Sequence, residues 1–306
     1  MKWQYKAKIM QICASLPMGD KIYKVIQKNF GNLKANPLSR INMQIEMDRW
    51  IREQGMLIEG RTFFEVGTGH KLTLPIGFFI SGAKQVITVD LYRRLDFDIL
   101  QKSLHWMVEN RKQLESIYKE VVDLTTLNER LNLLQRLQSD PQKFLVEANI
   151  QYLAPADATD TGLPNSSVDY HFSTTVMEHI PPKEIKKIFI EARRILKNDG
   201  VAIHFIDCSD HFQHQDNSIT KINFLKYTEE QWQRIAGNQF AYCNRLRASE
   251  YLRLFSDLSF TPIRHELYID RDSMNIIERG FLVDQQFSSF CPDDICTTAL
   301  KVMLRK

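Results

Sequence analysis

The sequence lacks any long hydrophobic run, and this excludes one class of protein. No stretch of about eighteen consecutive apolar residues occurs among the 306 residues, so no transmembrane helix is expected. The first residues contain lysines but no uninterrupted apolar segment. We therefore expect no signal peptide either.

Paired cysteines are also missing. The chain contains five cysteines, and no two of them have C-x-x-C spacing. An odd, scattered set is typical of reduced thiols in a reducing compartment. The expected location is therefore the cytoplasm.

A large net charge is absent too. The formal net charge is only +3, so the total gives no support for a nucleic-acid partner. Residues 1–40 nevertheless contain eight Lys or Arg residues against the single acid Asp20. Such a segment is a solvated face, a lid over the cofactor, or a surface for peripheral contact with anionic lipid. We favour the lid.

The first part of the chain has helical periodicity and then changes period. Residues 1–58 carry apolar side chains at helical spacing, with breaks at 17–20 and 31–37. Next come a short buried strand, "RTFFEV", a helix, "KLTLPIGFFISG", and a second strand, "KQVITVDL". Strand, helix and strand within about thirty residues predict a βαβ unit with a parallel sheet.

The remaining chain continues this alternation with two interruptions. Residues about 96–148 keep helical spacing and are expected to be a helical insertion. Strands resume at "IQYLAP", "VDYHFST" and "VAIHFI", and residues about 207–247 are polar and irregular. We predict an α/β, doubly wound, mostly parallel sheet. Its expected organisation is an N-terminal helical extension, residues 1–58, followed by one domain, residues 59–306.

The stretch "FFEVGTGHKLTLP" has the composition of a cofactor-binding turn. Two glycines, Gly67 and Gly69, follow a strand and precede a helix, so backbone amides there can approach a ligand closely. A lone G-x-G is often only a turn, and NAD would favour a third glycine where Leu72 stands. S-adenosylmethionine fits better, because Glu65 can meet its cationic amino group and Asp90 can accept both ribose hydroxyls.

Several ordered motifs together resemble the class I S-adenosylmethionine-dependent methyltransferases. "FEVGTG" resembles the first motif of that family, "VITVDL" its acidic second motif, and "EARRILKNDGVAIHFI" its later helix and fifth strand. The stretch "PADATDTGLPNSSVDYHFSTTVMEHI" resembles the family's acid loop and fourth strand. The resemblance covers residues about 60–305 and implies a seven-stranded Rossmann-like methyltransferase fold.

The resemblance also implies a set of cofactor-binding residues. Asp157 and Ala158 are expected to flank the adenine, and Ser173 with Thr174 to form the cofactor floor. The whole expected set is Glu65, Gly67, Thr68, Gly69, Asp90, Leu91, Asp157, Ala158, Ser173 and Thr174. Lys71 stands where many members have another glycine, so the turn must differ locally.

Candidate catalytic residues follow the fourth and fifth strands. Glu178–His179 resembles a pair in ubiquinone-biosynthesis O-methyltransferases, where an earlier acid completes a metal site. Thr175 occupies that earlier position here. His179 is then a catalytic residue, a helix cap, or a residue packed on the cofactor.

The second cluster is "IDCSDHFQHQD", which contains Asp207, Asp210 and His211. It is either a group of acid–base residues or a solvated polar loop. Its spacing fits no standard ligand pattern, so no metal is expected. Arg245 and Arg247 nearby are expected either to bind an anionic acceptor or to face water.

These features predict a methyltransferase that moves a methyl group from S-adenosylmethionine to oxygen, in preference to nitrogen, of a small-molecule or saccharide acceptor. The catalytic candidates are His179, Asp207, Asp210 and His211. The alternatives are a nucleic-acid or protein methyltransferase and a non-catalytic binding protein. The stretch "STTV" lacks the aromatic and proline residues favoured by base methylation, so no nucleic-acid partner is expected. The sequence does not indicate an oligomeric state.

Overall fold

The computed structural model describes residues 1–30 and 36–306. The predicted break at residues 31–37 lies mostly outside the described residues. The chain divides into two compact units. One contains the described part of residues 1–33 together with 174–186 and 204–302, and is called the first unit. The second unit contains the described part of residues 34–173 together with 187–203 and 303–306.

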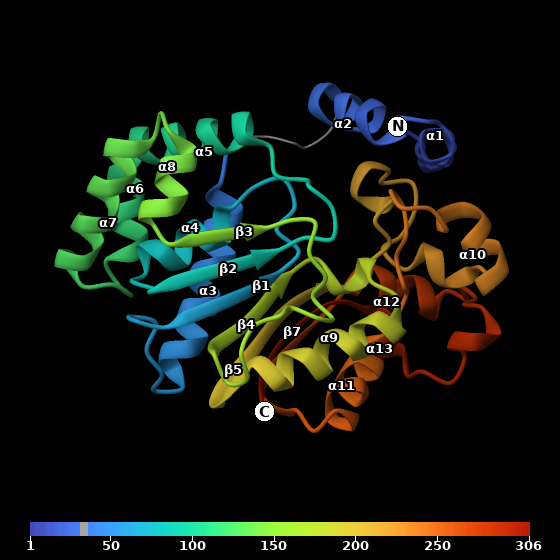
Figure 1. Ribbon diagram of the computed structural model, residues 1–306. Coiled ribbons are helices and arrows are strands. Elements are labelled where there is room, and N and C mark those ends of the chain that lie inside the picture. Colours follow the sequence, from blue (N-terminus) through green and yellow to red (C-terminus); the bar gives the residue numbers. More distant parts are fainter. Residues whose placement is uncertain (31–35) are drawn as a thin grey trace. The chain divides into compact units, whose positions relative to one another are not determined.

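The strands form one sheet, as the sequence predicted. In the described residues the sheet has seven strands in the order β3-β2-β1-β4-β5-β7-β6. Helices lie on both of its faces (Figure 1). The strands are β1 (Thr62–Val66), β2 (Gln85–Val89), β3 (Ile150–Leu153), β4 (Val168–Thr174), β5 (Leu196–Asp207), β6 (Thr261–Ile269) and β7 (Thr297–Arg305). This order, with its reversal between β1 and β4, confirms the doubly wound Rossmann-like methyltransferase fold.

The second unit is built on parallel strands. Strand β1 pairs in parallel with β2 and with β4, and β2 pairs in parallel with β3. Its strands are nearly continuous apolar runs, because both faces of a parallel sheet are covered. Phe63 stacks on Phe78 and Tyr170, with ring centroids 4.3 and 4.5 Å apart. These rings fix β1 at the centre of the core.

Helices of the second unit precede, connect and follow these strands. They are α3 (Leu38–Glu53), α4 (Thr73–Ile80), α5 (Phe97–Glu109), α6 (Arg111–Tyr118), α7 (Leu124–Leu137), α8 (Pro141–Glu147) and most of α9 (Pro182–Ile195). Local capping explains several of the starts. The side chains of Asp96, Asp123 and Asp140 accept backbone amides at the first turns of α5, α7 and α8. The segment predicted as a helical insertion therefore consists of α5 to α8.

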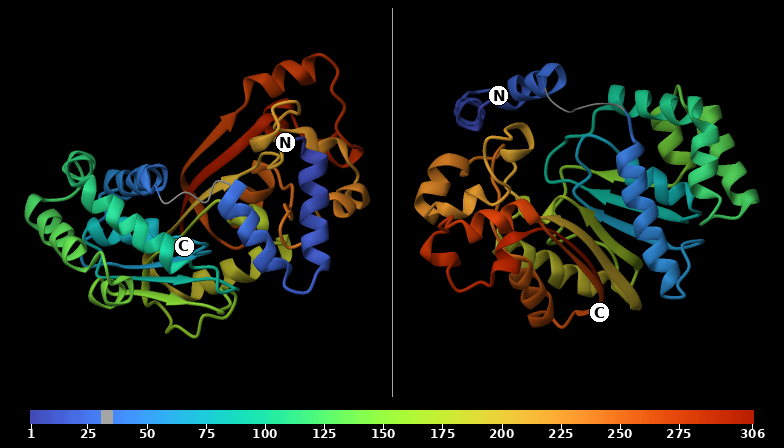
Figure 2. Two further views of the ribbon diagram at one scale, coloured as in Figure 1. Left: turned by 90° about the horizontal axis from the view of Figure 1, so that it is seen from above. Right: turned by 180° about the vertical axis from the view of Figure 1, so that it is seen from behind.

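The first unit contains α1 (Trp3–Ser15) and α2 (Gly19–Phe30), which lie side by side (Figure 2). It also contains α10 (Glu229–Ala236), α11 (Ala248–Asp257), α12 (Arg271–Glu278), α13 (Pro292–Cys296) and the short 3-10 turns η1 (Met177–His179), η2 (Gln213–Gln215), η3 (Asn223–Lys226) and η4 (Gln285–Phe287). Trp3 and Met10 of α1 pack in one apolar cluster with Phe212, Phe224 and Trp232. Helix α1 is thus held by a core shared with α10.

The N-terminal helices do not all belong to one unit. Helices α1 and α2 belong to the first unit, whereas α3 belongs to the second. None of the helices in the described residues is long and apolar enough to cross a membrane.

Candidate functional site

The glycine turn lies in the second unit, between β1 and α4. Gly67 and Gly69 have φ angles of +85° and +64°, in the left-handed region that glycine adopts without strain. A Cβ added at Gly69 would meet nothing within 4 Å, so its backbone angle rather than crowding requires glycine. No side chain caps the first turn of α4. Its amides are therefore available to a ligand.

Asp90 connects the turn to the end of the second strand. Its Oδ2 accepts the Gly69 amide at 2.9 Å, and its Oδ1 faces the Tyr92 amide at 3.4 Å. Leu91, beside it, is exposed. The carboxylate that was predicted to bind ribose thus also shapes the glycine turn.

Glu65 is buried beneath the turn. The hydroxyl of Thr88 donates to its Oε2 at 2.5 Å, and the hydroxyls of Thr88 and Thr68 lie 2.6 Å apart. Burial raises the pKa of Glu65 to about 8, although the Thr88 bond and the charge of Arg40 oppose the shift. Sequence reasoning missed Thr88. Its signal was a polar side chain inside the apolar strand "VITV".

The other predicted cofactor residues lie at the ends of β3 and β4. The Asp157 carboxylate accepts the Thr159 amide at 2.8 Å, and Ala158 is buried. Ser173 and Thr174 are buried at the end of β4. All of the predicted set belongs to the second unit except Thr174, which begins a segment of the first.

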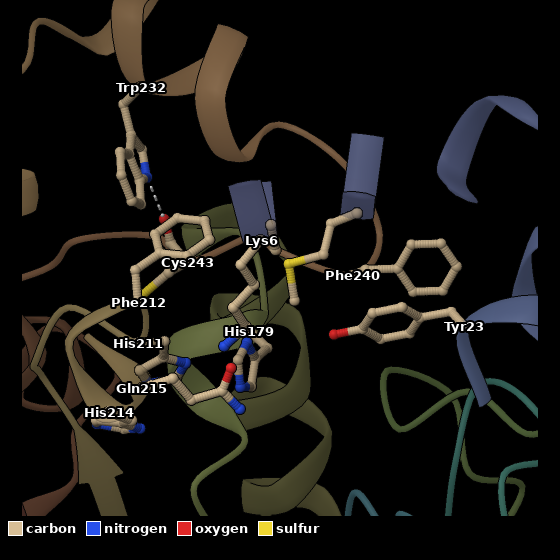
Figure 3. Close-up of a pocket in the computed structure, with 12 residues that line it drawn as sticks. Lys6, Tyr23, His179, His211, Phe212, His214, Gln215, Trp232, Phe240 and Cys243 are labelled. Atoms are coloured by element: carbon tan, nitrogen blue, oxygen red, sulfur yellow. Dashed lines mark hydrogen bonds between the residues drawn. The ribbon is translucent and has the colours of Figure 1, made fainter. Parts of the chain in front are cut away.

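The first unit contains a pocket of about 290 Å³ (Figure 3). Aromatic rings supply much of its wall, and three imidazoles, an ammonium and an amide supply the polar part. The lining residues are Lys6, Met10, Tyr23, His179, His211, Phe212, His214, Gln215, Trp232, Phe240, Ala241 and Cys243. Every one of them belongs to the first unit. The pocket therefore combines stacking surfaces with groups that can exchange protons or bind a cation.

His179 and His211 lie close together on the pocket wall. Their ring centroids are 4.8 Å apart, and Nδ1 of His179 is 2.9 Å from the carbonyl of Tyr242. Ligand-capable atoms of Glu178, His179 and His211 all lie within 4.8 Å of one another. Burial raises the pKa of Glu178 to about 8, and the charge of His211 opposes this shift. The fold thus brings a residue pair after β4 together with a histidine after β5.

Asp207 lies beside the imidazoles. Its Oδ2 is 3.5 Å from Nε2 of His211 and of His214, and its Oδ1 accepts the Ser209 hydroxyl at 2.6 Å. Burial acts to raise its pKa, but His211 and Ser209 lower it to about 2. Burial likewise acts to lower the pKa of His211, and Asp207 raises it above the ordinary value. Asp207 and His211 therefore form a charged pair.

Asp210 occupies a different environment. It is completely buried, and its carboxylate accepts the Phe212 amide at 2.9 Å and the Asn223 amide at 3.3 Å. Burial raises its pKa to about 6, against these two hydrogen bonds. It is not among the residues that line the pocket. Its contacts hold the turn on which His211 lies.

The expectation for Arg245 and Arg247 was wrong in both of its alternatives. Both side chains are buried, so neither faces water or the pocket. Arg247 donates to the carbonyl of Cys208 at 2.9 Å, and Arg245 pairs with Glu229 at 2.6 Å. Their guanidinium groups are used to satisfy backbone carbonyls inside the first unit.

Lys6, Tyr23 and Phe240 were not singled out by sequence reasoning. Lys6 and Tyr23 come from the N-terminal helices, and Tyr23 stacks on Phe240 with ring centroids 4.5 Å apart. Burial lowers the pKa of Lys6. The basic composition of residues 1–40 was the signal for Lys6 and Tyr23, and Phe240 lies in the irregular segment 207–247.

Comparison with known proteins gives one family match. Residues 109–204 match the family model described as a methyltransferase domain. The chain carries a methyltransferase domain. The match covers about a third of the chain. The matched range begins after β2, so the glycine turn lies outside it. No curated protein matches the sequence.

Solved structures give distant likenesses to this chain. The YcgJ protein of Bacillus subtilis is 15% identical, with a TM-score of 0.45, over 87% of this chain and 98% of that chain. Phosphoethanolamine N-methyltransferase 2 of Haemonchus contortus is 15% identical, with a TM-score of 0.46, over 85% of this chain and 52% of that chain. Geranyl diphosphate C-methyltransferase of Streptomyces coelicolor is 12% identical, with a TM-score of 0.46, over 85% of this chain and 78% of that chain. The chain thus spans about half the length of the Haemonchus protein. These values are too low to indicate an acceptor.

Proposed function

We propose that this chain is a methyltransferase that uses S-adenosylmethionine as its methyl donor and transfers the methyl group to a hydroxyl oxygen of a small molecule that binds in the pocket of the first unit. The observation that carries the proposal is the composition of that pocket. Its wall combines the imidazoles of His179 and His211 with four aromatic side chains, and Glu178 lies beside them. A hydroxyl must lose its proton during methylation, whereas an amine can attack through its lone pair. Groups that handle a proton beside the cavity therefore favour oxygen.

An aromatic acceptor fits this pocket better than a saccharide. Phe212 and Trp232 present aromatic surface to the cavity, and Tyr23 and Phe240 add a second pair of rings (Figure 3). A phenol can stack on such rings and turn its hydroxyl toward the imidazoles. A saccharide would bring several hydroxyls, each of which needs a hydrogen-bond partner. The acceptor is therefore proposed to be a phenol-like molecule.

The proposed chemistry is an in-line displacement. A lone pair of the acceptor oxygen forms a bond to the methyl carbon while the carbon–sulfur bond breaks and leaves its electron pair on sulfur. The products are a methyl ether and S-adenosylhomocysteine. The hydroxyl proton leaves at the cluster of Glu178, His179 and His211, with Asp207 beside it to balance a positive imidazole. This arrangement requires the acceptor oxygen to lie about 3 Å from the methyl carbon.

The cofactor residues belong to the same proposal. The uncapped amides of the first turn of α4 are proposed to receive the amino-acid end of the cofactor, because the amides of Gly67 and Gly69 already donate to Val89 and Asp90. Glu65 is proposed to meet its ammonium group, and Asp90 the ribose hydroxyls. The uncapped start of α4 and the buried carboxylate of Glu65 support these roles.

The N-terminal helices are proposed to cover the acceptor. Lys6 and Met10 of α1 and Tyr23 of α2 line the pocket, which supports a lid rather than a membrane contact. The cytoplasmic location stays a prediction.

The experiment uses S-adenosylmethionine with a deuterated methyl group and separate panels of phenols, saccharides and amines, with mass spectrometry of the products. We expect a labelled methyl ether from a phenol. His211→Asn should lose most of the turnover and keep the affinity for S-adenosylhomocysteine, because His211 lines the pocket and not the glycine turn. Asp90→Ala should lose the cofactor affinity itself. A labelled nitrogen or carbon in the product would show that the oxygen assignment is wrong.

A further inference from the structure

We infer that Glu178, His179 and His211 form a binding site for a divalent transition metal ion of the zinc type. Glu178 and His179 belong to the 3-10 turn η1, which follows β4, and His211 belongs to the turn after β5. One ligand-capable atom from each lies within 4.8 Å of the others. The sequence alone predicted no metal, because Thr175 stands in the place of an acid. His211 joins the pair only through the fold, from 32 positions further along the chain.

The first argument is the state of Glu178. Its side chain is 1% exposed, and neither carboxylate oxygen has a hydrogen-bond partner in the described residues. A buried carboxyl group without partners is costly in either protonation state, because even the neutral acid leaves a donor and an acceptor unsatisfied. A cation would satisfy the oxygens directly.

The second argument is that the two imidazoles have the outer partners that metal-bound histidines use. The Tyr242 carbonyl, 2.9 Å from Nδ1 of His179, favours the tautomer with its proton on Nδ1 and its lone pair on Nε2. The Asp207 carboxylate lies 3.5 Å from Nε2 of His211, at ion-pair distance without a hydrogen bond, and is itself held by Ser209. Carbonyl and carboxylate partners of this kind orient a ligating ring and increase its basicity.

Two imidazoles and one carboxylate are a donor set suited to zinc and its neighbours rather than to magnesium or calcium, which prefer oxygen alone. In the tetrahedral geometry of zinc, bonds of about 2.1 Å place the donors about 3.4 Å apart. Donor atoms 4.8 Å apart would therefore have to close by roughly 1.4 Å, which rotations of the side chains can provide. Because His179 and His211 line the pocket, an open coordination position would face the cavity.

An ion in this position would explain how the pocket handles a hydroxyl. This role rests on the proposed function, whereas the binding site itself does not. With the ion bound, Glu178, His179 and His211 would act as ligands in place of proton acceptors. A hydroxyl at the open position would then have its pKa lowered by the ion and would lose its proton to solvent water before the methyl transfer. Cys243, also on the pocket wall, is a poor competing ligand, because burial raises the pKa of its thiol and keeps it protonated.

The test is calorimetric titration of the full-length protein, stripped with a chelator, with zinc chloride alone. Cys291→Ser serves as the background, because Cys291 is the exposed cysteine and its thiol can bind zinc. We expect one site of micromolar affinity or tighter, a visible absorption band when cobalt replaces zinc, and no comparable binding of magnesium. Glu178→Gln and His211→Asn should each weaken zinc binding by about 100-fold or more, because each removes a direct ligand.

The controls are His214→Gln and Cys243→Ser, which alter the pocket wall but leave the three ligands intact. Both should keep the zinc affinity. Retained affinity for S-adenosylhomocysteine and an unchanged circular dichroism spectrum show that each variant is folded, and His179→Asn replaces any variant that is not. Absence of a single zinc site, or zinc binding that is indifferent to all three ligand variants, would overturn the site. Full methylation of a phenol in the presence of chelator would show that the ion has no role in activating the hydroxyl, and it would leave the proposed function standing.

Discussion

At the scale of single residues, Glu65 links protonation to cofactor binding. Its carboxyl is buried and its pKa is raised to about 8, so the unliganded protein holds it mostly neutral at pH 7. If it meets the ammonium of the cofactor, binding must release its proton. Affinity for S-adenosylmethionine should therefore rise between pH 6 and 7.5, by at most about tenfold per unit, the limit for one proton.

The measurement is calorimetry across this range with the wild type and Glu65→Gln. The amino group of the cofactor also changes its protonation with pH. The effect of Glu65 is therefore measured as the difference between the pH profiles of the two proteins. The amide cannot ionise, and its pH profile should be flatter as well as weaker. Equal slopes in both proteins would show that Glu65 does not respond to the cofactor.

His171 of β4 predicts a pH effect on stability. It is 1% exposed and stacks on Phe64, and burial lowers its pKa to about 3. The unfolded chain binds a proton below the ordinary value of about 6.5 and the folded chain does not, so stability falls as the pH drops below 6.5. The loss should reach roughly 2 kcal/mol at pH 5.

The phenylalanine variant His171→Phe should lose less thermal stability between pH 7.5 and 5 than the wild type does, because its ring cannot be protonated. Melting temperatures at the two pH values measure this difference. His265→Gln, which changes an exposed histidine, is the control. A His171→Phe profile that parallels the wild type would mean that other groups cause the acid sensitivity.

Single residues also show where sequence reasoning stops. The order Glu65, Gly67, Gly69 and Asp90 is local, so its chemistry could be inferred from spacing. The burial of Arg247 could not be inferred in this way, because its guanidinium donates to carbonyls up to 50 positions away along the chain. A pattern of neighbours in the sequence contains no information on such partners.

At the scale of elements, α1 is the part of the proposed lid with the clearest attachment. The Trp3 ring lies 5.5 Å from that of Phe212 and 6.2 Å from that of Tyr227, and its amide donates to Asp216 at 2.7 Å. Trp3→Ala removes the indole ring that packs on Phe212 and Tyr227. We expect the free energy that holds α1 in place to fall by about 3 kcal/mol or more.

Limited proteolysis with trypsin measures this attachment. Cleavage after Lys6 and Lys8 should become at least tenfold faster in Trp3→Ala, and acceptor turnover should fall while S-adenosylhomocysteine affinity is kept. Tyr5→Ala, which changes an exposed side chain of the same helix, is the control. If Trp3→Ala is cleaved quickly but keeps full turnover, α1 is not needed at the acceptor site, and its proposed role as a lid is wrong.

Elements differ in how far their sequences define them. Strands β1 and β2 were predicted to within two residues, whereas α9 ends at Ile195 and β5 begins at Leu196, earlier than the expected strand "VAIHFI". The short elements α12, η4 and α13 were not predicted, because three to eight residues contain too few turns to show a period. Their apolar side chains, such as Phe287 and Ile295, are buried in the cluster that holds α1.

At the scale of the whole molecule, the two predicted clusters of function belong to different compact units. The glycine turn and its acid belong to the second unit, and the pocket belongs to the first. Strand β4 is continuous between them, since Ser173 is assigned to one and Thr174 to the other. The sequence could predict the strand ends where both clusters begin. It also suggested the N-terminal helices as a lid, but it could not identify Lys6, Met10 and Tyr23 as the side chains that line the pocket.

The net charge of the whole molecule leads to a prediction about nucleic-acid binding. A protein that reads or modifies nucleic acid needs cations that face phosphates, and its affinity then falls steeply with salt. Here the net charge is +3, and Lys6, from the basic segment, lines the pocket and is partly withdrawn from solvent. We therefore expect no binding of a single-stranded RNA beyond the weak non-specific level, with a dissociation constant above about 10⁻⁵ M at physiological salt.

Fluorescence anisotropy of a labelled RNA at low and at physiological salt measures this affinity. Replacement of the exposed Lys2, Lys8 and Lys21 by Gln provides the matched control, because it removes three charges of the N-terminal segment without touching the pocket wall. Weak binding that disappears in this variant would be a non-specific surface effect. Tight, salt-sensitive binding that persists, together with label transferred to the RNA, would identify a nucleic acid as the acceptor and exclude the small-molecule proposal.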